Sequence, residues 1–233
     1  GPGVAVGAPH PRHDRAVAEA DDERARAVLR ERRGRSRDFF SSVAGRWDTV
    51  REELFGVDSE MLPLFGLLDP NATLGDLGAG TGHFAARVAP FLGGVIAVDA
   101  SEEMLAAAKD RLGNAPNVDL RRGELEDLPI ADGELDLAVL LLVLHYVMEP
   151  LAVLAEARRT LKPGGRIVIV DMRQHSREDY LEGMGHAWPG FDETELLGWH
   201  RDAGLVDFAY SRLPARPEAS GPLLFVTSAR RPC

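Results

Sequence analysis

A glycine-rich loop directly after a short apolar run constrains the fold of this chain more than any other feature. Residues 74–82 read LGDLGAGTG, so a predicted strand at 73–77 ends in alternating glycines that open a helix. Such glycines let the backbone approach a ligand closely, and open α/β sheets bind cofactors at the carboxyl ends of their strands. The dinucleotide fingerprint G-x-G-x-x-G is not matched, because His83 stands where its third glycine belongs, and no Gly-Lys-Ser/Thr follows as in a P-loop. The loop therefore predicts an α/β protein with a cofactor site of another kind.

Apolar runs that alternate with helical patterns follow this loop, as in βα units around a parallel sheet. A helix is then expected at about 192–203, before two strands, 205–211 and 222–228, that have no helix between them and should pair antiparallel at one edge. The predicted fold class is α/β, a doubly wound, mostly parallel seven-stranded sheet with an antiparallel last strand. The other expected strands are 73–77, 94–99, 117–122, 135–141 and 166–171, with helices at about 82–92, 101–112 and 149–161.

The segment before the sheet has a different pattern. Residues 1–20 mix Gly, Pro, Ala, His and Arg without apolar periodicity, so we expect a poorly ordered tail. From Asp21 onward apolar residues recur at helical spacings, with an interruption near Gly34. The expected parts are the tail at 1–20, an N-terminal helical cap at 21–68 and a cofactor-binding domain at 69–233.

Charge and cysteine content argue against several classes of function. Twenty-seven basic and 37 acidic residues give a net charge of -10, which would repel a phosphate backbone, so nucleic acid is not an expected partner. Cys233 is the single cysteine, so neither a disulfide framework nor a multi-cysteine metal site is possible within one chain. The longest apolar run, 137–144, has eight residues, against roughly 20 for a membrane span. We expect a cytoplasmic protein with no metal, membrane or nucleic-acid partner.

Asp99 closes the second predicted strand, seventeen residues after Gly82. A carboxylate at this strand end lies beside the glycine loop and can accept two hydrogen bonds from a ribose diol. The alternative role, capping the next helix, is better suited to Ser101, which is followed by two acidic residues. Asp99 therefore indicates a ligand that contains adenosine.

Five signatures in register resemble the class I S-adenosylmethionine-dependent methyltransferases, and together they span about residues 73–172. In order, they are LGDLGAGTG at 74–82, Asp99, GELEDLP at 123–129, Asp136 and LKPGG at 161–165, which is expected to form a turn. More narrowly, the segment 39–48 and HAWPGF at 186–191 are similar to methyltransferase domains that follow an ArsR-type winged-helix regulator in some bacterial proteins. No winged-helix pattern is recognisable in this sequence, so we expect a relative without the regulator.

This resemblance implies S-adenosylmethionine as the cofactor and assigns a site to it. The loop glycines would admit the methionine moiety and the ribose, Asp76 would face the ammonium group, and Asp99 would take the ribose hydroxyls. Glu124 would lie opposite the adenine amino group, with Met104 packed on the ring. Trp47 would close the pocket unless it packs in the core instead. The implied cofactor residues are Trp47, Asp76, Gly78, Ala79, Gly80, Gly82, Asp99, Ala100, Met104, Glu124, Leu125, Leu140 and Leu141.

Three histidines are candidates for a catalytic base. A sulfonium donor is already activated, so the protein mainly aligns the acceptor and excludes water, but an oxygen or nitrogen acceptor also has a proton to lose. His145 follows the fourth strand, His175 follows the fifth, and His186 lies in a segment expected to cover the cleft. An ordinary imidazole titrates near pH 6.5 and can accept a proton at neutral pH. Each could instead be a structural or exposed histidine; we favour His145 as the base.

The acceptor is expected to be a small organic molecule. DNA amino-methylating enzymes carry an Asp/Asn-Pro-Pro-Tyr stretch after strand four, whereas residues 141–146 read LLVLHY. Metal-assisted catechol methylation calls for an acid near 141 and an Asp-Asn pair after strand five, where residues 171–172 read DM, and arsenite methylation needs several thiolates. An apolar or ring-bearing acceptor is suggested by aromatic residues in the covering segments, namely Phe39, Phe40, Trp188 and Phe191.

Two other functions remain open at this point. A regulatory or partner-binding relative could keep the cofactor pocket without turnover, and only product formation would separate it from an enzyme. A nicotinamide oxidoreductase is opposed by the glycine spacing and by the lack of a Tyr-x-x-x-Lys pair. The N-terminal helices would cap the active site or pair two subunits, and an exposed face at Phe39 and Phe40 would favour a homodimer.

Overall fold

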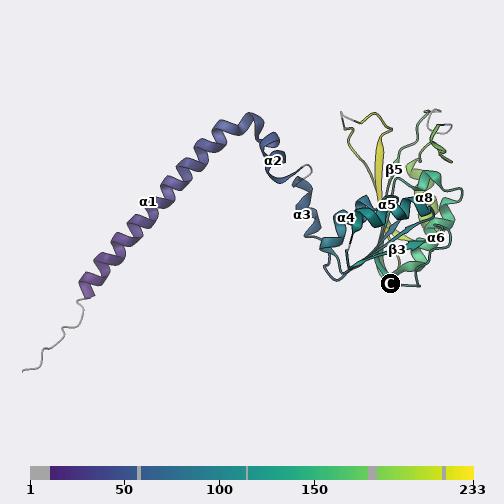
Figure 1. Ribbon diagram of the computed structural model, residues 1–233, viewed down its shortest axis with the longest axis horizontal. Coiled ribbons are helices and arrows are strands. Elements are labelled where there is room, and N and C mark those ends of the chain that lie inside the picture. Colours follow the sequence, from purple (N-terminus) through teal and green to yellow (C-terminus); the bar gives the residue numbers. More distant parts are fainter. Residues whose placement is uncertain (1–10, 57–58, 114, 178–182, 217–218) are drawn as a thin grey trace, which may run out of the picture. The chain divides into compact units, whose positions relative to one another are not determined.

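The computed structural model describes residues 11–56, 59–113, 115–177, 183–216 and 219–233 (Figure 1). The chain divides into two compact units, Gly1–Leu62 and Pro63–Cys233. No helix in the described part of the chain is long and apolar enough to cross a membrane.

The N-terminal unit is helical and begins earlier than predicted. Helix α1 covers Pro11–Val43, so the expectation of a poorly ordered segment up to residue 20 is wrong for residues 11–20, while residues 1–10 lie outside the described part. Proline suits a first helical turn, and the alanines, arginines and acidic residues that follow are tolerated or favoured in helices. The helix also runs through Gly34 without the predicted interruption, because one glycine costs only about 1 kcal/mol in a helix interior. A single 3-10 turn then leads into α2, Trp47–Phe55.

The second unit contains a seven-stranded sheet in the order β3-β2-β1-β4-β5-β7-β6. The first five strands are parallel, and β7 is antiparallel to both of its neighbours. This arrangement confirms the predicted doubly wound α/β fold with an antiparallel last strand. The strands are β1 Thr73–Leu77, β2 Gly94–Asp99, β3 Val118–Arg122, β4 Leu135–Leu141, β5 Leu161–Met172, β6 Val206–Arg212 and β7 Leu224–Arg230.

Two apolar layers cover the two faces of this sheet, and the alternation of side chains along each strand assigns residues to them. In β2, Ile96 and Val98 belong to the larger core, whereas Val95 and Ala97 belong to the smaller one. The larger core includes side chains of α6 and α8, and the smaller includes side chains of α3 and α4. The helices of this unit are α3 Leu62–Phe65, α4 His83–Val88, α5 Glu102–Leu112, α6 Pro150–Thr160 and α8 Glu193–Asp202.

Strand β5 starts five residues before the predicted strand at 166–171. Residues 161–165, expected to form a turn, are instead part of the strand: Leu161 lies opposite Leu135, and after a register shift Arg166 lies opposite Leu137. The extra residues are accommodated at this irregularity, where Gly164 has φ +77°. Glycine and proline in this stretch therefore mark a bulge inside a strand.

Candidate active site

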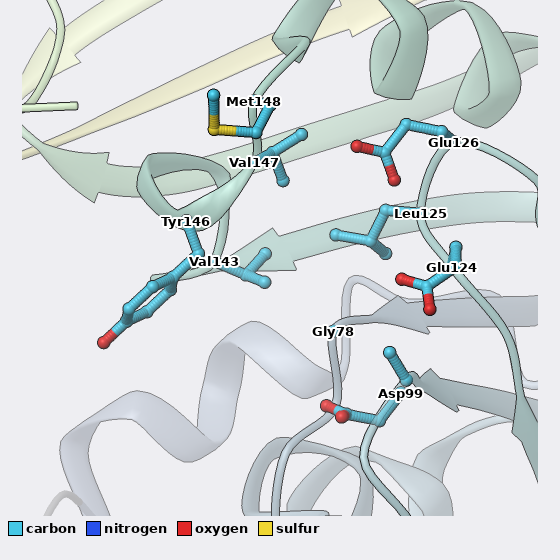
Figure 2. A pocket seen from close by; sticks show the side chains of 10 residues that line it. Gly78, Asp99, Glu124, Leu125, Glu126, Val143, Tyr146, Val147 and Met148 are labelled. Atoms are coloured by element: carbon cyan, nitrogen blue, oxygen red, sulfur yellow. The ribbon is translucent and has the colours of Figure 1, made fainter. Parts of the chain in front are cut away.

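A cavity of about 260 Å³ lies at the carboxyl ends of β1, β2, β3 and β4 (Figure 2). Half of its wall consists of predicted cofactor residues, and the other half was not predicted. Figure 2 shows the carboxylates of Asp99, Glu124 and Glu126 along one side and the ring of Tyr146 on the other. The predicted members of the wall are Gly78, Asp99, Ala100, Glu124 and Leu125; the others are Glu126, Val143, Tyr146, Val147 and Met148.

The glycine loop that begins at Gly78 has no room for side chains at this position. Gly78 has φ +79°, and a Cβ added there would lie 2.5 Å from Cγ2 of Val143. The backbone N–H groups of Gly78 and Ala79 both donate to the carbonyl oxygen of Val98, at 2.8 and 2.9 Å, which ties the loop to the neighbouring strand. Gly80 and Gly82 also have positive φ, at +53° and +69°. The loop is thus a backbone cradle of the kind that a bulky ligand requires.

Asp99 anchors the same loop. Its Oδ2 accepts a hydrogen bond from the backbone N–H of Gly80 at 2.7 Å, and its Oδ1 accepts one from Ser101 at 2.9 Å. The helix cap is supplied by Ser101, whose side chain accepts from the N–H of Met104 at 3.1 Å. Each carboxylate oxygen can accept a further hydrogen bond, and Asp99 lines the cavity, so it keeps acceptor capacity for a diol.

Asp76 is buried directly before the loop, with 2% of its surface exposed. Burial raises its pKa to about 7, a hydrogen bond with the backbone of Ala85 offsets part of this, and the nearby charge of Asp99 raises the pKa further. Within the described part of the chain, Oδ2 of Asp76 has no hydrogen-bond partner. A buried carboxyl oxygen without a donor fits a cationic ligand group such as an ammonium.

Other predicted cofactor residues lie outside the cavity wall. Met104 is on α5 and is 45% exposed. Leu141 lines a separate apolar groove of about 650 Å³ on the face of the sheet. Trp47 belongs to the N-terminal unit, where its ring centroid is 5.1 Å from that of Phe40, and its part in the cofactor site stays a prediction. The remaining members outside the wall are Asp76, Ala79, Gly80, Gly82 and Leu140.

His145 forms a buried pair with Asp171. It lies in the 3-10 turn Leu144–Tyr146 after β4, and its Nδ1 is 2.7 Å from Oδ1 of Asp171 at the end of β5. Both side chains are buried, at 5% and 0% exposure. The next residue, Tyr146, lines the cavity, and its ring centroid is 4.2 Å from that of His145. The pair therefore lies directly behind the cavity wall.

The structure also brings His186 to this pair. Its ring centroid is 4.3 Å from that of His145, and the N–H groups of Ala187 and Trp188 both donate to the carbonyl oxygen of His145. Burial lowers the pKa of His186, and the charges of His145 and His175 lower it further, against the opposite effect of Asp171. The described residues contain no group of three or more His, Cys, Asp or Glu side chains placed to hold a metal ion.

His175 is in the same region but contacts a different partner. Its backbone N–H donates to the carbonyl oxygen of Pro189 at 2.9 Å, and its Nδ1 accepts from the N–H of Arg177 at 3.1 Å. Of the three predicted base candidates, the structure thus places His145 and His186 in ring contact and His175 next to the segment that carries His186.

Asp171 and Tyr146 were missed as site residues. Both lie at the edge that the carboxyl ends of parallel strands share, since one ends β5 and the other lies in the turn after β4, but this rule alone does not single them out. The pairing of His145 with Asp171 joins residues 26 apart in the sequence and depends on the adjacency of β4 and β5.

Comparison with known proteins agrees with this geometry. Residues 75–169 match the family described as "Methyltransferase domain". The chain is 32% identical over 168 residues to a demethylmenaquinone methyltransferase of Clavibacter sepedonicus, covering 60% of this chain and 68% of that protein. It is 42% identical over 104 residues, 43% of this chain, to an uncharacterized 37.1 kDa protein in transposon TN4556 of Streptomyces fradiae, of which it spans only 30%.

The fold is shared with solved methyltransferase structures. A phosphoethanolamine N-methyltransferase 2 of Haemonchus contortus in complex with S-adenosyl-L-methionine superimposes with a TM-score of 0.65 at 17% identity, covering 75% of this chain and 52% of that one. Fold, glycine cradle and sequence similarity agree on the cofactor, S-adenosylmethionine. The chain belongs to the class I S-adenosylmethionine-dependent methyltransferases.

Proposed function

We propose that this protein transfers the methyl group of S-adenosylmethionine to an oxygen or nitrogen atom of a small organic molecule, with His145 as the base. The observation that carries the proposal is the buried His145, which pairs with Asp171 and touches Tyr146 on the cavity wall. His145 itself does not line the cavity, but its ring contacts Tyr146, which does, so the base lies next to the wall of the space in which the cofactor and the acceptor would meet. Oxygen and nitrogen acceptors need such a base because they lose a proton on methylation.

In this proposal the cavity residues hold the cofactor. Gly78 and Gly80 cradle the methionine and ribose parts, Asp99 accepts the ribose hydroxyls, Glu124 meets the adenine amino group, and Asp76 faces the ammonium. The backbone cradle, the acceptor capacity of Asp99 and the orphaned oxygen of Asp76 support these roles. When bound, the cofactor supplies an electrophilic methyl group whose bond to sulfur breaks with the electron pair remaining on sulfur.

Carbon methylation of a hydroxylated ring is a second candidate reaction. The similarity to a demethylmenaquinone methyltransferase favours it. Removing the hydroxyl proton of a ring activates either its oxygen or the carbon beside it, so the same base serves both outcomes. The acceptor, not the base, would then decide which atom is methylated.

The alternative function, a regulatory or partner-binding protein without turnover, would use the same cofactor pocket. We propose an enzyme rather than a binding protein because a buried histidine and aspartate behind the wall are not required for cofactor binding.

Four further predictions remain part of the proposal. They are the narrower resemblance to methyltransferase domains fused to ArsR-type regulators, the cytoplasmic location, the N-terminal helices as a cap of the active site, and a homodimer formed through Phe39 and Phe40. Both phenylalanines are about half exposed, at 47% and 49%, which suits a contact surface.

Titration calorimetry with S-adenosylmethionine, with NAD and with an Asp99→Ala variant tests the cofactor site. We expect the wild type to bind S-adenosylmethionine and not NAD, and we expect the variant to bind at least about 10-fold more weakly, because it loses charge-assisted hydrogen bonds to the ribose and the anchor of Gly80. Acceptors are then screened by mass spectrometry for the gain of one CH₂ unit. Binding without any methylated product from a broad panel of hydroxylated and amino compounds would favour the protein without turnover.

A further inference from the structure

Asp171 is a fully buried carboxylate, and the ion pair recorded for it among the described residues is with His145, which is charged only when it is protonated. Its Oδ1 accepts hydrogen bonds from the backbone N–H of Met172 and faces Nδ1 of His145, both at 2.7 Å. No hydrogen bond to its Oδ2 is present among the described residues, although this oxygen is also buried. Burying a carboxylate is costly, and a hydrophobic residue would pack here without that cost. A retained buried carboxylate facing one imidazole nitrogen indicates a functional role.

We propose that Asp171 is a positioning residue that keeps the proton of His145 on Nδ1, so that Nε2 takes the proton from the hydroxyl group of an aromatic acceptor. This inference rests on the proposed function and specifies its base and its substrate class. A carboxylate only accepts hydrogen bonds, so the nitrogen that faces it must carry the proton. The other nitrogen is then an acceptor, and in the described part of the chain no hydrogen bond occupies it.

The surroundings of His145 match a flat, weakly acidic acceptor. The rings of Tyr146 and His186 lie 4.2 and 4.3 Å from that of His145, and 5.0 Å from each other, so three rings meet beside the cavity. Exposed apolar side chains follow on the same loops, with Met148 75% exposed and Met184 55% exposed. Aromatic and thioether side chains pack well on an aromatic ring.

Every proton and electron pair in the proton transfer can be accounted for. The hydroxyl hydrogen moves to Nε2 of His145 and the electrons of the O–H bond stay on the acceptor, which forms its new bond to the methyl carbon through oxygen or through the adjacent ring carbon. The positive charge on the imidazolium lies against Asp171 until the proton leaves to solvent. If the ring carbon reacts, its own hydrogen leaves as a second proton and the hydroxyl is restored.

The test compares the wild type with Asp171→Asn on two acceptors, a naphthol and a nitrophenol that is already ionised at the assay pH. Asparagine keeps the shape but can donate to Nδ1 and so move the proton to Nε2. For the naphthol we expect kcat to fall by about 10²- to 10⁴-fold, the usual contribution of a general base. For the ionised nitrophenol, which needs no base, we expect a change within about 3-fold. Affinity for S-adenosylmethionine, measured by calorimetry, should stay within about 2-fold because Asp171 is not part of the cavity wall.

Asp136→Asn is the matched control. Asp136 is a carboxylate on β4 that is bonded to Thr73 and Lys162 and lies outside the cavity wall, so its removal should leave kcat for both acceptors unchanged. An equal loss for naphthol and nitrophenol in Asp171→Asn would show a merely structural role and overturn the inference. If wild-type protein methylates only amines or thiols, the aromatic hydroxyl class is wrong while the proposed methyl transfer stands.

A pH profile of the wild type decides the question if Asp171→Asn fails to fold. The groups that face His145 are Asp171 from β5, Tyr146 from its own turn and His186 from the covering segment, with His175 acting on His186 through its charge. A base at His145 predicts an acidic limb in kcat for the naphthol and its absence for the nitrophenol over the pH range in which the nitrophenol stays ionised. The same limb for both acceptors would contradict the role of Asp171 and His145 in proton removal.

Discussion

At the scale of single residues, Gly78 shows how the cofactor cradle constrains the sequence. An alanine there would need φ +79° and would place its Cβ 2.5 Å from Cγ2 of Val143, a β-branched side chain with little freedom to move. We expect Gly78→Ala to lose about 2–5 kcal/mol of unfolding free energy, the sum of left-handed strain and overpacking. Urea denaturation measures this loss, and calorimetry should show that binding of S-adenosylmethionine is lost as well.

Gly80→Ala is the control for the crowding at Gly78. Gly80 also has positive φ, +53°, but a Cβ there meets nothing within 4 Å. We expect this variant to lose only the strain of about 1–2 kcal/mol. Equal losses of unfolding free energy in the two variants would mean that Val143 yields easily and that the cradle is not tightly packed.

The same residues show what sequence reasoning can and cannot supply about a site. Gly78 and Asp99 were predictable because the motif fixes backbone conformation and position within a few consecutive residues. Asp171 was not, because nothing local marks it: its role appears only when β4 and β5 pair and bring it to His145. Tyr146 and Met148 line the cavity through the path of a loop, which periodicity does not encode.

At the scale of elements, the segment 185–191 folds back across the ends of β4 and β5 and holds His186 in place. Gly190 has φ +75°, and a Cβ there would lie 2.7 Å from the carbonyl oxygen of Met172, which belongs to the strand backbone and cannot yield. Gly190→Ala should therefore displace this segment from β5, breaking the hydrogen bond from the N–H of Phe191 to Met172. We expect a fall in kcat of at least about 10-fold, because a misplacement of about 1 Å can cost that much, with cofactor affinity nearly unchanged.

Gly185→Ala changes a residue of the same segment and separates the effect of steric crowding by an added Cβ from the effect of backbone strain. It has φ +73° but no atom within 4 Å of an added Cβ, so its strain of about 1–2 kcal/mol should leave the segment in place. Methyl transfer and urea denaturation are measured for both variants. If Gly185→Ala reduces kcat as much as Gly190→Ala does, contact with β5 is not what positions His186.

Helices and strands were predictable where the pattern of apolar residues changes between a period of two residues and a period of 3.6 residues. They were less predictable where one residue type, such as proline or glycine, occurs both in turns and in strand bulges. Strands at 73–77, 94–99 and 135–141 have the predicted bounds. The stretch 161–165 looked like a turn because proline and glycine also mark turns, whereas it belongs to β5 and contains a bulge after Leu161, which pairs with β4. Helix α1 continues through Gly34 because its neighbours in the helix outweigh one unfavourable residue.

At the scale of the whole molecule, Asp76 should make stability fall as the pH rises from 3.8 to about 7. Its pKa is about 7 in the folded protein, against 3.8 for an ordinary aspartate, so between these values the unfolded chain releases a proton that the folded chain keeps. The stabilising contribution is complete below pH 3.8 and is lost as the pH rises through about 7. At 1.36 kcal/mol per pKa unit the effect is at most about 4 kcal/mol.

Asp76→Asn removes this titration while keeping nearly the same shape, so the difference in unfolding free energy between the two proteins isolates Asp76. Burial lowers the pKa of His186 and His200, which weakens the fold as the pH falls below about 6.5, and both proteins share that effect. Relative to the variant, the wild type should therefore lose stability steadily between about pH 4 and 7 in urea denaturation. Parallel curves for the two proteins would show that Asp76 is already ionised in the folded state, with a counter-charge or water reaching its buried oxygen.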